Sequence, residues 1–158
     1  MRSMYSMNRE RGMTMVESLV SLVVISIGLL GIAALYLSSL KAGRAALLQT
    51  HAINLASDMA DRIRANRPAR AAYDMATYGG NPATRGCVNG PCDSAQLAQD
   101  DLARWLTSIR ATLPGRPQST GNVVFAGNAP DPDAYTITVG WQEAGSNAAS
   151  NYSLIVQQ

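Results

Sequence analysis

The sequence has few of the side chains on which most enzymes and metal sites depend. Its 158 residues include one histidine, His51, and two cysteines, Cys87 and Cys92. A zinc site built on both cysteines would need two more ligands, and His51 lies far from them in a predicted helix. No GxSxG, HExxH or phosphate-binding loop occurs, and no nucleophile has an obvious base beside it. We therefore expect no catalytic site, metal or cofactor, and predict that the protein is not an enzyme.

A surplus of charge is also missing beyond the first residues. Residues 1–12 hold three of the 13 basic side chains and one of the 11 acidic ones, so residues 13–158 carry 10 of each sign. Proteins that bind nucleic acid through its phosphates present a basic surface. The balance of charge gives no reason to expect a nucleic-acid partner.

The longest stretch without any charge runs from Ser18 to Leu40 and contains 23 residues. At 1.5 Å per residue, a helix of this length spans about 34 Å, which is enough to cross a hydrocarbon core of about 30 Å. Arg2, Arg9 and Arg11 precede it, so the positive-inside rule keeps the N-terminus in the cytoplasm and places the remainder across the membrane. This pattern predicts a single-pass membrane protein.

Two other export signals fit the N-terminal region less well. A secretory signal peptide has an apolar core of about 7–15 residues followed by a small-x-small cleavage site. The apolar run here is longer, and Leu40-Lys41-Ala42 is a poor site for signal peptidase. A lipoprotein is also disfavoured, because no cysteine follows the apolar run.

The two cysteines enclose the short sequence Val-Asn-Gly-Pro. An even pair this close, in an oxidising compartment, predicts a small-loop disulfide, with free thiols or half of a zinc site as alternatives. The loop is short, so the bond removes little chain entropy and is expected to rigidify a loop rather than hold the fold together. Four intervening residues do not match the C-x-x-C motif of thiol oxidoreductases, and a bitopic periplasmic redox or enzyme domain remains only an alternative.

Periodicity predicts the order of the remaining elements. The first helix continues beyond the apolar run as an amphipathic helix, about 50 residues in all, until Pro68. Residues 68–93 lack clean periodicity and are predicted as a loop. A second helix begins at Asp93 or Ser94 and ends at Pro114-Gly115. Its predicted core face comprises Leu97, Ala98, Leu102, Trp105, Leu106, Ile109 and Leu113.

The C-terminal part alternates apolar and polar residues, which is typical of strands. The predicted strands are Asn122–Ala126, Tyr135–Trp141 and Tyr152–Val156. We predict an α+β fold, in which a long N-terminal helix with a transmembrane first half packs on a small antiparallel sheet of about three to four strands. His51 is interpreted as a solvated or interfacial helix residue, and Trp105 and Trp141 as core anchors.

The sequence Arg11-Gly12-Met13-Thr14-Met15-Val16-Glu17-Ser18-Leu19 resembles a class III (prepilin) signal. It has a short basic leader that ends in glycine, an apolar first mature residue, and glutamate at the fifth mature position. The resemblance is to the type IV prepilin family, and within it to PilV-type minor pilins, with type II secretion pseudopilins a close second. Met13 stands where the family usually has phenylalanine, which bears on the efficiency of cleavage.

The resemblance implies a role for each matching residue. Prepilin peptidase would cleave between Gly12 and Met13, because glycine lets a membrane aspartyl protease approach the extended backbone. Met13 would then carry a methylated amine. Glu17 would neutralise that amine on a neighbouring subunit, since a lone carboxylate at the apolar end of a helix is costly unless it is paired. Glu17 as a mere headgroup anchor is the alternative.

The resemblance also implies an organisation and a function. Residues 1–12 would be the leader peptide, 13–40 the transmembrane and assembly helix, and 41–158 a periplasmic pilin-like domain. The expected function is that of a minor pilin that primes or caps a type IV pilus. Its partners would be prepilin peptidase, other minor pilins, the major pilin and the inner-membrane assembly platform. A minor pseudopilin of type II secretion and a DNA-binding competence pilin are alternatives, the second weakened by the neutral mature chain.

Overall fold

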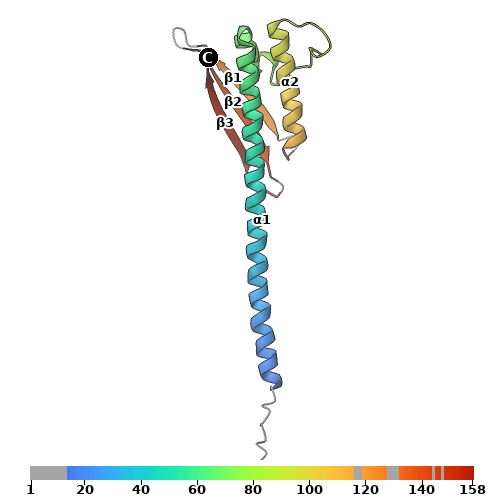
Figure 1. Cartoon of the computed structure of the whole chain (residues 1–158), viewed down its shortest axis with the longest axis vertical. Helices are drawn as coiled ribbons and strands as arrows, with labels where there is room; N and C mark the ends of the chain where they lie inside the picture. The colour runs from blue at the N-terminus through green and yellow to red at the C-terminus, as the bar shows by residue number, and fades with distance from the viewer. Residues whose placement is uncertain (1–13, 116–118, 128–131, 144, 147) are drawn as a thin grey trace, which may run out of the picture. The chain divides into compact units, whose positions relative to one another are not determined.

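The computed structural model describes residues 14–115, 119–127, 132–143, 145–146 and 148–158. The chain divides into two compact units, Met1–Gly43 and Arg44–Gln158. The element order is α1, η1, η2, α2, β1, β2 and β3, where η1 and η2 are short 3-10 helices. This arrangement confirms the predicted α+β fold (Figure 1).

Helix α1 (Met15–Ala65) has 51 residues, close to the predicted length, and runs through both units. Within the first unit its large apolar side chains are exposed, and its most apolar window has a mean hydropathy of 2.5 with no part buried. By length and composition α1 is the one helix among the described residues that is able to cross a membrane.

The part of α1 in the second unit buries a stripe of side chains with helical spacing. Several members are alanines, which allow other elements to approach the helix closely. The polar side chains, among them Asp58 and Asp61, are exposed on the other side, as the amphipathic pattern predicts. His51 is half-buried beside this stripe. The buried residues of α1 are Leu48, Ala52, Ala56, Met59, Ala60 and Ile63.

The segment predicted as a loop over residues 68–93 contains two 3-10 helices, so the prediction was wrong for its first part. They are η1 (Arg67–Tyr73) and η2 (Met75–Tyr78). Pro68 lies in the first turn of η1, where a backbone N–H has no partner within the helix. The absence of an N–H in proline therefore costs no hydrogen bond there. Such short helices contain too few turns to produce a hydrophobic periodicity that a sequence pattern would show.

Helix α2 (Ser94–Thr112) starts at an N-cap that Asp93 provides, one of the two predicted residues. The Asp93 side chain accepts from the Gln96 N–H at 2.7 Å, and Gln96 Oε1 accepts from the Asp93 N–H, which completes a capping box. The predicted core face of α2 is buried except for Leu97, which is 38% exposed. The buried stripe begins at Ala98, because the helical turn directs the neighbouring Leu97 away from the core.

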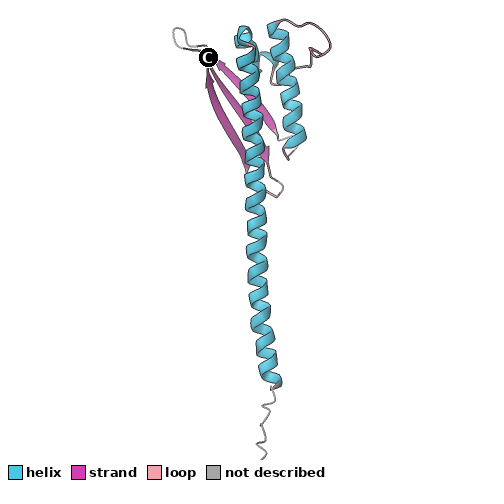
Figure 2. Ribbon diagram, in the orientation of Figure 1, coloured by secondary structure: helices cyan, strands magenta, loops and turns pink. Residues whose placement is uncertain are grey.

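The sheet has three antiparallel strands in the order β1-β2-β3 within the described residues (Figure 2). They are β1 (Thr120–Ala126), β2 (Ala134–Gln142) and β3 (Ala149–Gln157), each longer than its predicted counterpart. The extra terminal residues are small or polar, so alternation alone did not reveal them. The inner face of β2 supplies Tyr135, Ile137, Val139 and Trp141 to the core.

Close packing between α2 and β1 depends on one glycine. A Cβ at Gly121 would lie 2.5 Å from Trp105 Cζ3 and 2.6 Å from Ile109 Cδ1. Trp105 is fully buried, and its indole N–H donates to the Leu55 carbonyl oxygen at 2.8 Å. Both predicted tryptophan anchors are buried in the core of the second unit, which confirms that interpretation.

Candidate functional site

The start of α1 is capped by Thr14, which immediately precedes the first helical residue. The Glu17 N–H donates to Thr14 Oγ1 at 3.3 Å, and the Ser18 N–H donates to the Thr14 carbonyl oxygen at 3.2 Å. Thr14 therefore satisfies a donor that would otherwise lack a partner in the first turn. Sequence analysis missed this role, although the spacing Thr14-x-x-Glu17 is the pattern of a capping box.

Glu17 lies in the first turn of α1 and is exposed in the single chain. A carboxylate in this turn interacts favourably with the positive end of the helix dipole. The predicted cleavage site, between Gly12 and Met13, lies outside the described residues. The structure therefore shows the position of Glu17, the acidic residue of the candidate site. The pairing of Glu17 with a Met13 amine stays a prediction.

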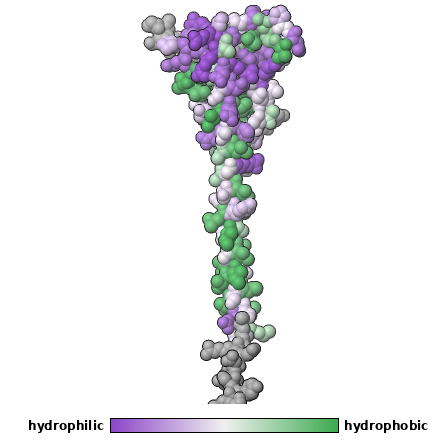
Figure 3. Space-filling model, viewed as in Figure 1, coloured by the Kyte–Doolittle hydropathy of each residue, from purple (hydrophilic) through white to green (hydrophobic). Residues whose placement is uncertain are grey.

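Large apolar side chains are exposed along the helix that follows Glu17, and Figure 3 shows those on the face in view. Gly28 and Gly31 have nothing within 4 Å of the position of a Cβ, so the first unit leaves room there for another helix to approach. Exposed apolar surface of this extent needs lipid or other helices around it. The exposed large apolar residues between Met15 and Leu40 include Leu19, Leu22, Val24, Ile27, Leu30, Ile32, Leu35 and Leu37.

Cys87 and Cys92 form a disulfide with Cα atoms 5.6 Å apart, as the sequence predicted. The segment leading into this loop is tied to α2 by Asp100, which is buried. Asp100 Oδ1 accepts from the Arg85 N–H at 2.6 Å and from the Gly86 N–H at 2.9 Å. This anchor was absent from the sequence analysis, because an aspartate within an amphipathic helix carries no sign of a distant backbone partner.

The electrostatics around Asp100 favour its charged form. Burial opposes ionisation, but the two backbone N–H groups and the Arg104 guanidinium outweigh it and hold the pKa of Asp100 below its ordinary value. Arg104 Nε donates to Asp100 Oδ2 at 2.7 Å. Asp100 therefore acts as a charged anchor that fixes the start of the disulfide loop on α2.

A second polar network joins the end of α1 to η1 and α2. Arg62 donates to Asp58 and to Asp101, each at 3.0 Å, and the Tyr73 hydroxyl donates to Asp101 Oδ2 at 2.8 Å. Burial raises the pKa of Tyr73 well above its ordinary value. Asn66 Nδ2 donates to the Ser94 carbonyl oxygen at 2.8 Å. These groups satisfy one another, which is the arrangement of a structural network rather than a reactive one.

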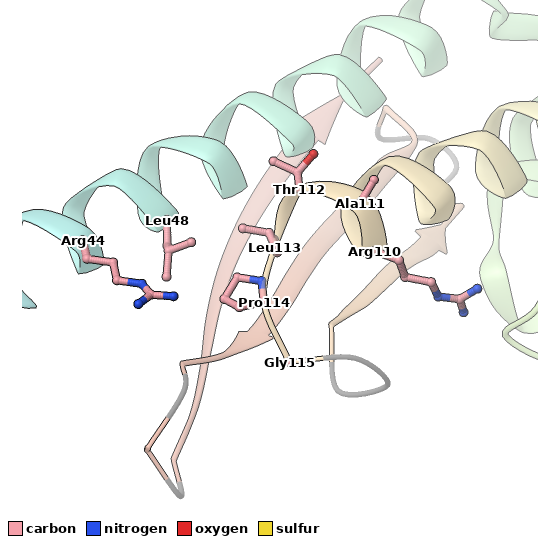
Figure 4. A pocket seen from close by; sticks show the side chains of 8 residues that line it. All are labelled: Arg44, Leu48, Arg110, Ala111, Thr112, Leu113, Pro114 and Gly115. Carbon is pink, nitrogen blue, oxygen red and sulfur yellow. The ribbon is translucent and has the colours of Figure 1, made fainter.

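Described residues of the second unit line several cavities. One, of about 440 Å³, lies between Arg44 and Leu48 of α1 and the end of α2 (Figure 4). Its other lining residues are Arg110, Ala111, Thr112, Leu113, Pro114 and Gly115, without a carboxylate or histidine. Among the described residues, no three His, Cys, Asp or Glu side chains gather in a way that would hold a metal ion.

Comparisons with known proteins agree with the features at the N-terminus. The family model of a prokaryotic N-terminal methylation motif matches residues 7–33, a range that contains the predicted cleavage site and Glu17. A second family model, type IV pilin Tt1218, matches residues 34–103, which include the rest of α1 and part of α2. No curated protein and no solved structure matches. With the apolar helix and the α+β fold, the two consecutive matches show that the chain belongs to the type IV prepilin-like family and is a pilin-like subunit.

Proposed function

We propose that the chain is a minor subunit of a type IV pilus, similar to PilV-type pilins, and that it joins the filament through its N-terminal helix. The observation that supports this most directly is the position of Glu17. It is the only charged residue between Thr14 and Leu40, it stands in the first helical turn, and the apolar surface beside it is exposed. A charge in that position is expected to have a partner once the helix is surrounded by other helices.

The partner in this proposal is the amine that cleavage creates on Met13 of a neighbouring subunit. Removal of residues 1–12 by prepilin peptidase leaves this amine two residues before the helix starts. A buried pair of opposite charges sets the axial position of one helix against another more sharply than apolar contacts do. The exposed glycines Gly28 and Gly31 would let neighbouring helices pack closely further along.

The second unit is assigned to the periplasm. The disulfide of Cys87 and Cys92 forms in oxidising compartments, and the basic leader is typical of a cytoplasmic N-terminus. The satisfied polar networks of this unit favour a structural, non-enzymatic role. The other partners in this proposal are the major pilin, other minor pilins and the assembly platform. The same N-terminal features would serve a secretion pseudopilus, and the filament that contains the subunit distinguishes the two.

Glu17→Gln is the decisive change, because glutamine keeps the shape and the helix-capping ability of the residue and removes only its charge. The Met13 amine of the neighbour would then be buried without a partner. Such a loss typically amounts to about 3–5 kcal/mol, or a hundredfold or more in the assembly equilibrium. The measurement is the amount of this subunit in sheared surface fibres relative to the membrane, with cleavage checked by intact mass.

Thr14→Ala is the matched control, since it removes the helix cap and leaves the charge. A lost cap costs about 1 kcal/mol, so incorporation should fall less than about tenfold. The proposal predicts a clear separation of the two variants. If Glu17→Gln enters fibres at the wild-type ratio, charge pairing is not the mechanism and Glu17 only anchors the helix at the headgroups.

A further inference from the structure

The two edges of the sheet differ in what covers them. The register of β1 and β2, together with that of β2 and β3, identifies which backbone groups face outward at each edge. The Gln158 N–H donates to the Asp133 carbonyl oxygen at 2.9 Å, which continues the β2–β3 register by one pair. Because hydrogen-bonded pairs alternate along an antiparallel ladder, the even-numbered residues of β3 bond to β2.

The backbone N–H and C=O groups of the odd-numbered residues of β3 therefore point away from the sheet. These residues are Ala149, Asn151, Ser153, Ile155 and Gln157, and their side chains are all exposed. Among the described residues, β3 pairs with β2 alone, and no hydrogen bond reaches these outward groups. The outer edge of β3 therefore presents five donors and five acceptors along nine residues.

The opposite edge is covered in part by the protein itself. The same alternation directs the Phe125 N–H outward from β1, and the carboxylate of Asp74 accepts from it at 3.2 Å. The other oxygen of Asp74 caps η2 by accepting from the Ala76 N–H at 2.8 Å. The 3-10 segment thus occupies the outward N–H of Phe125 at the β1 edge, whereas no hydrogen bond reaches the outward groups of β3 in the described part of the chain.

The open edge also lacks the features that natural sheets use to prevent pairing. Edge strands are usually kept apart by charged side chains, proline, bulges or short length. β3 has nine residues without charge or proline, and its register with β2 is continuous. Neither β1 nor β2 contains a charged residue, so no charge on the strands of the sheet would repel an approaching neighbour electrostatically.

We propose that the β3 edge binds an extended segment of a neighbouring filament subunit, which adds to the sheet as a fourth strand. Main-chain hydrogen bonds to the outward groups of β3 would supply affinity. Alternate side chains of the segment would be apolar where they meet Tyr152 and Leu154, which are half-buried on the inner face. The proposal rests on assembly with other pilin-like subunits and is independent of which filament they form.

The occupant is a different subunit rather than a second copy of this chain. In a second copy, Asp74 blocks part of the β1 edge by binding the Phe125 N–H, so the fully open edge that this copy could offer is its own β3. Two identical edges joined in this way form a closed, two-fold pair. A closed pair leaves no edge for the next subunit, whereas filament growth needs head-to-tail contacts.

Photocrosslinking in cells that assemble the filament tests this proposal. A photoreactive benzoylphenylalanine replaces Ile155 on the outer edge strand, and in the control it replaces Thr136, its register partner on the central strand. We expect the probe at 155 to form an adduct that peptide mass spectrometry maps to an extended segment of another filament subunit. The probe at 136 should give at least about tenfold less, since a neighbour at the edge lies a further strand spacing of about 4.8 Å away.

Ser153→Pro provides the specific block, with Ser153→Ala as its control. The N–H of residue 153 points outward, so proline there leaves the internal ladder intact but prevents a strand from docking. The adduct from position 155 should fall at least about tenfold with proline and persist with alanine. Tryptophan fluorescence and an intact disulfide would show that the proline variant is folded. Amide exchange gives a second measurement, with Asn151, Ser153, Ile155 and Gln157 slower in assembled than in detergent-extracted wild-type protein.

Three results would overturn the proposal. They are an adduct at 155 no stronger than at 136, an adduct that a folded Ser153→Pro variant still forms, and an adduct to β3 of a second copy. The adduct is expected both at the membrane and in the fibre. Its absence therefore counts against the proposal in whichever of the two places the subunit is found. Incorporation of Glu17→Gln into fibres is read separately, which keeps failure of this proposal distinct from failure of the proposed function.

Discussion

The carboxylate of Asp100 allows a direct test of how the segment before the disulfide is held on α2. It accepts from the N–H groups of Arg85 and Gly86 and from Arg104 Nε, at distances between 2.6 and 2.9 Å. Asp100→Ala leaves the two backbone donors without their acceptor, at about 1–1.5 kcal/mol each. The ion pair adds less than about 1 kcal/mol, because Arg104 is 42% exposed and its charge stays solvated. The expected loss is therefore about 2–4 kcal/mol in the free energy of unfolding.

The same group predicts a dependence on pH. Because the pKa of Asp100 in the folded chain is lower than in the unfolded chain, its contribution is fully present above the unfolded value of about 3.9. The contribution is lost as the pH falls below about 4 through the folded value. Asp100→Asn keeps an acceptor oxygen for the backbone N–H groups but does not titrate. It should be less destabilising than alanine at neutral pH and should lose stability less steeply in acid.

The assay is urea unfolding of the full chain in detergent, followed by tryptophan fluorescence. Trp105 and Trp141 both lie in the second unit, so the signal reports on that unit alone. Asp61→Ala is the matched control, because its ion pair with Arg64 is exposed and is worth less than about 1 kcal/mol. A loss below about 0.5 kcal/mol for Asp100→Ala, similar to that of the control, would refute the role assigned to this anchor.

The remaining predictions concern processing, the disulfide and the core. If Gly12 is the last leader residue, the mature chain has 146 residues, which are the 158 of the sequence less 12. Intact mass and N-terminal sequencing of the membrane-extracted protein will show this length. A start beyond residue 40 would instead favour an ordinary signal peptide. Cys87 and Cys92 should resist alkylation without reductant, and changing both to serine should cost about 1–3 kcal/mol, because the loop is short. Trp105→Phe should cost about 1–3 kcal/mol in urea unfolding, since it removes the indole N–H bonded to the Leu55 carbonyl and leaves a small cavity. Unchanged stability would show that this contact contributes little.

Most of the elements could be predicted from the sequence, because each depends on a local pattern. The long α1 follows from an uninterrupted apolar run and its amphipathic continuation, and α2 from a regular stripe that starts after an aspartate cap. The strands follow from alternation, although their small and polar ends were missed. The disulfide follows from the short distance along the chain between two cysteines. The membrane signal and the prepilin pattern are likewise contiguous, and the family matches cover the same residues.

Contacts between residues far apart in the chain were decided only by the tertiary structure. Asp100 and Arg85 are 15 residues apart, and no pattern in either segment shows that the carboxylate meets the backbone of the other. The short 3-10 helices carry no periodicity, yet Asp74 between them binds an outward N–H at one edge of the sheet. Which strand is left open at the other edge depends on that packing, since β1 and β3 are both uncharged and alternating in sequence. Local propensity specifies the elements, whereas partner choice depends on three-dimensional proximity.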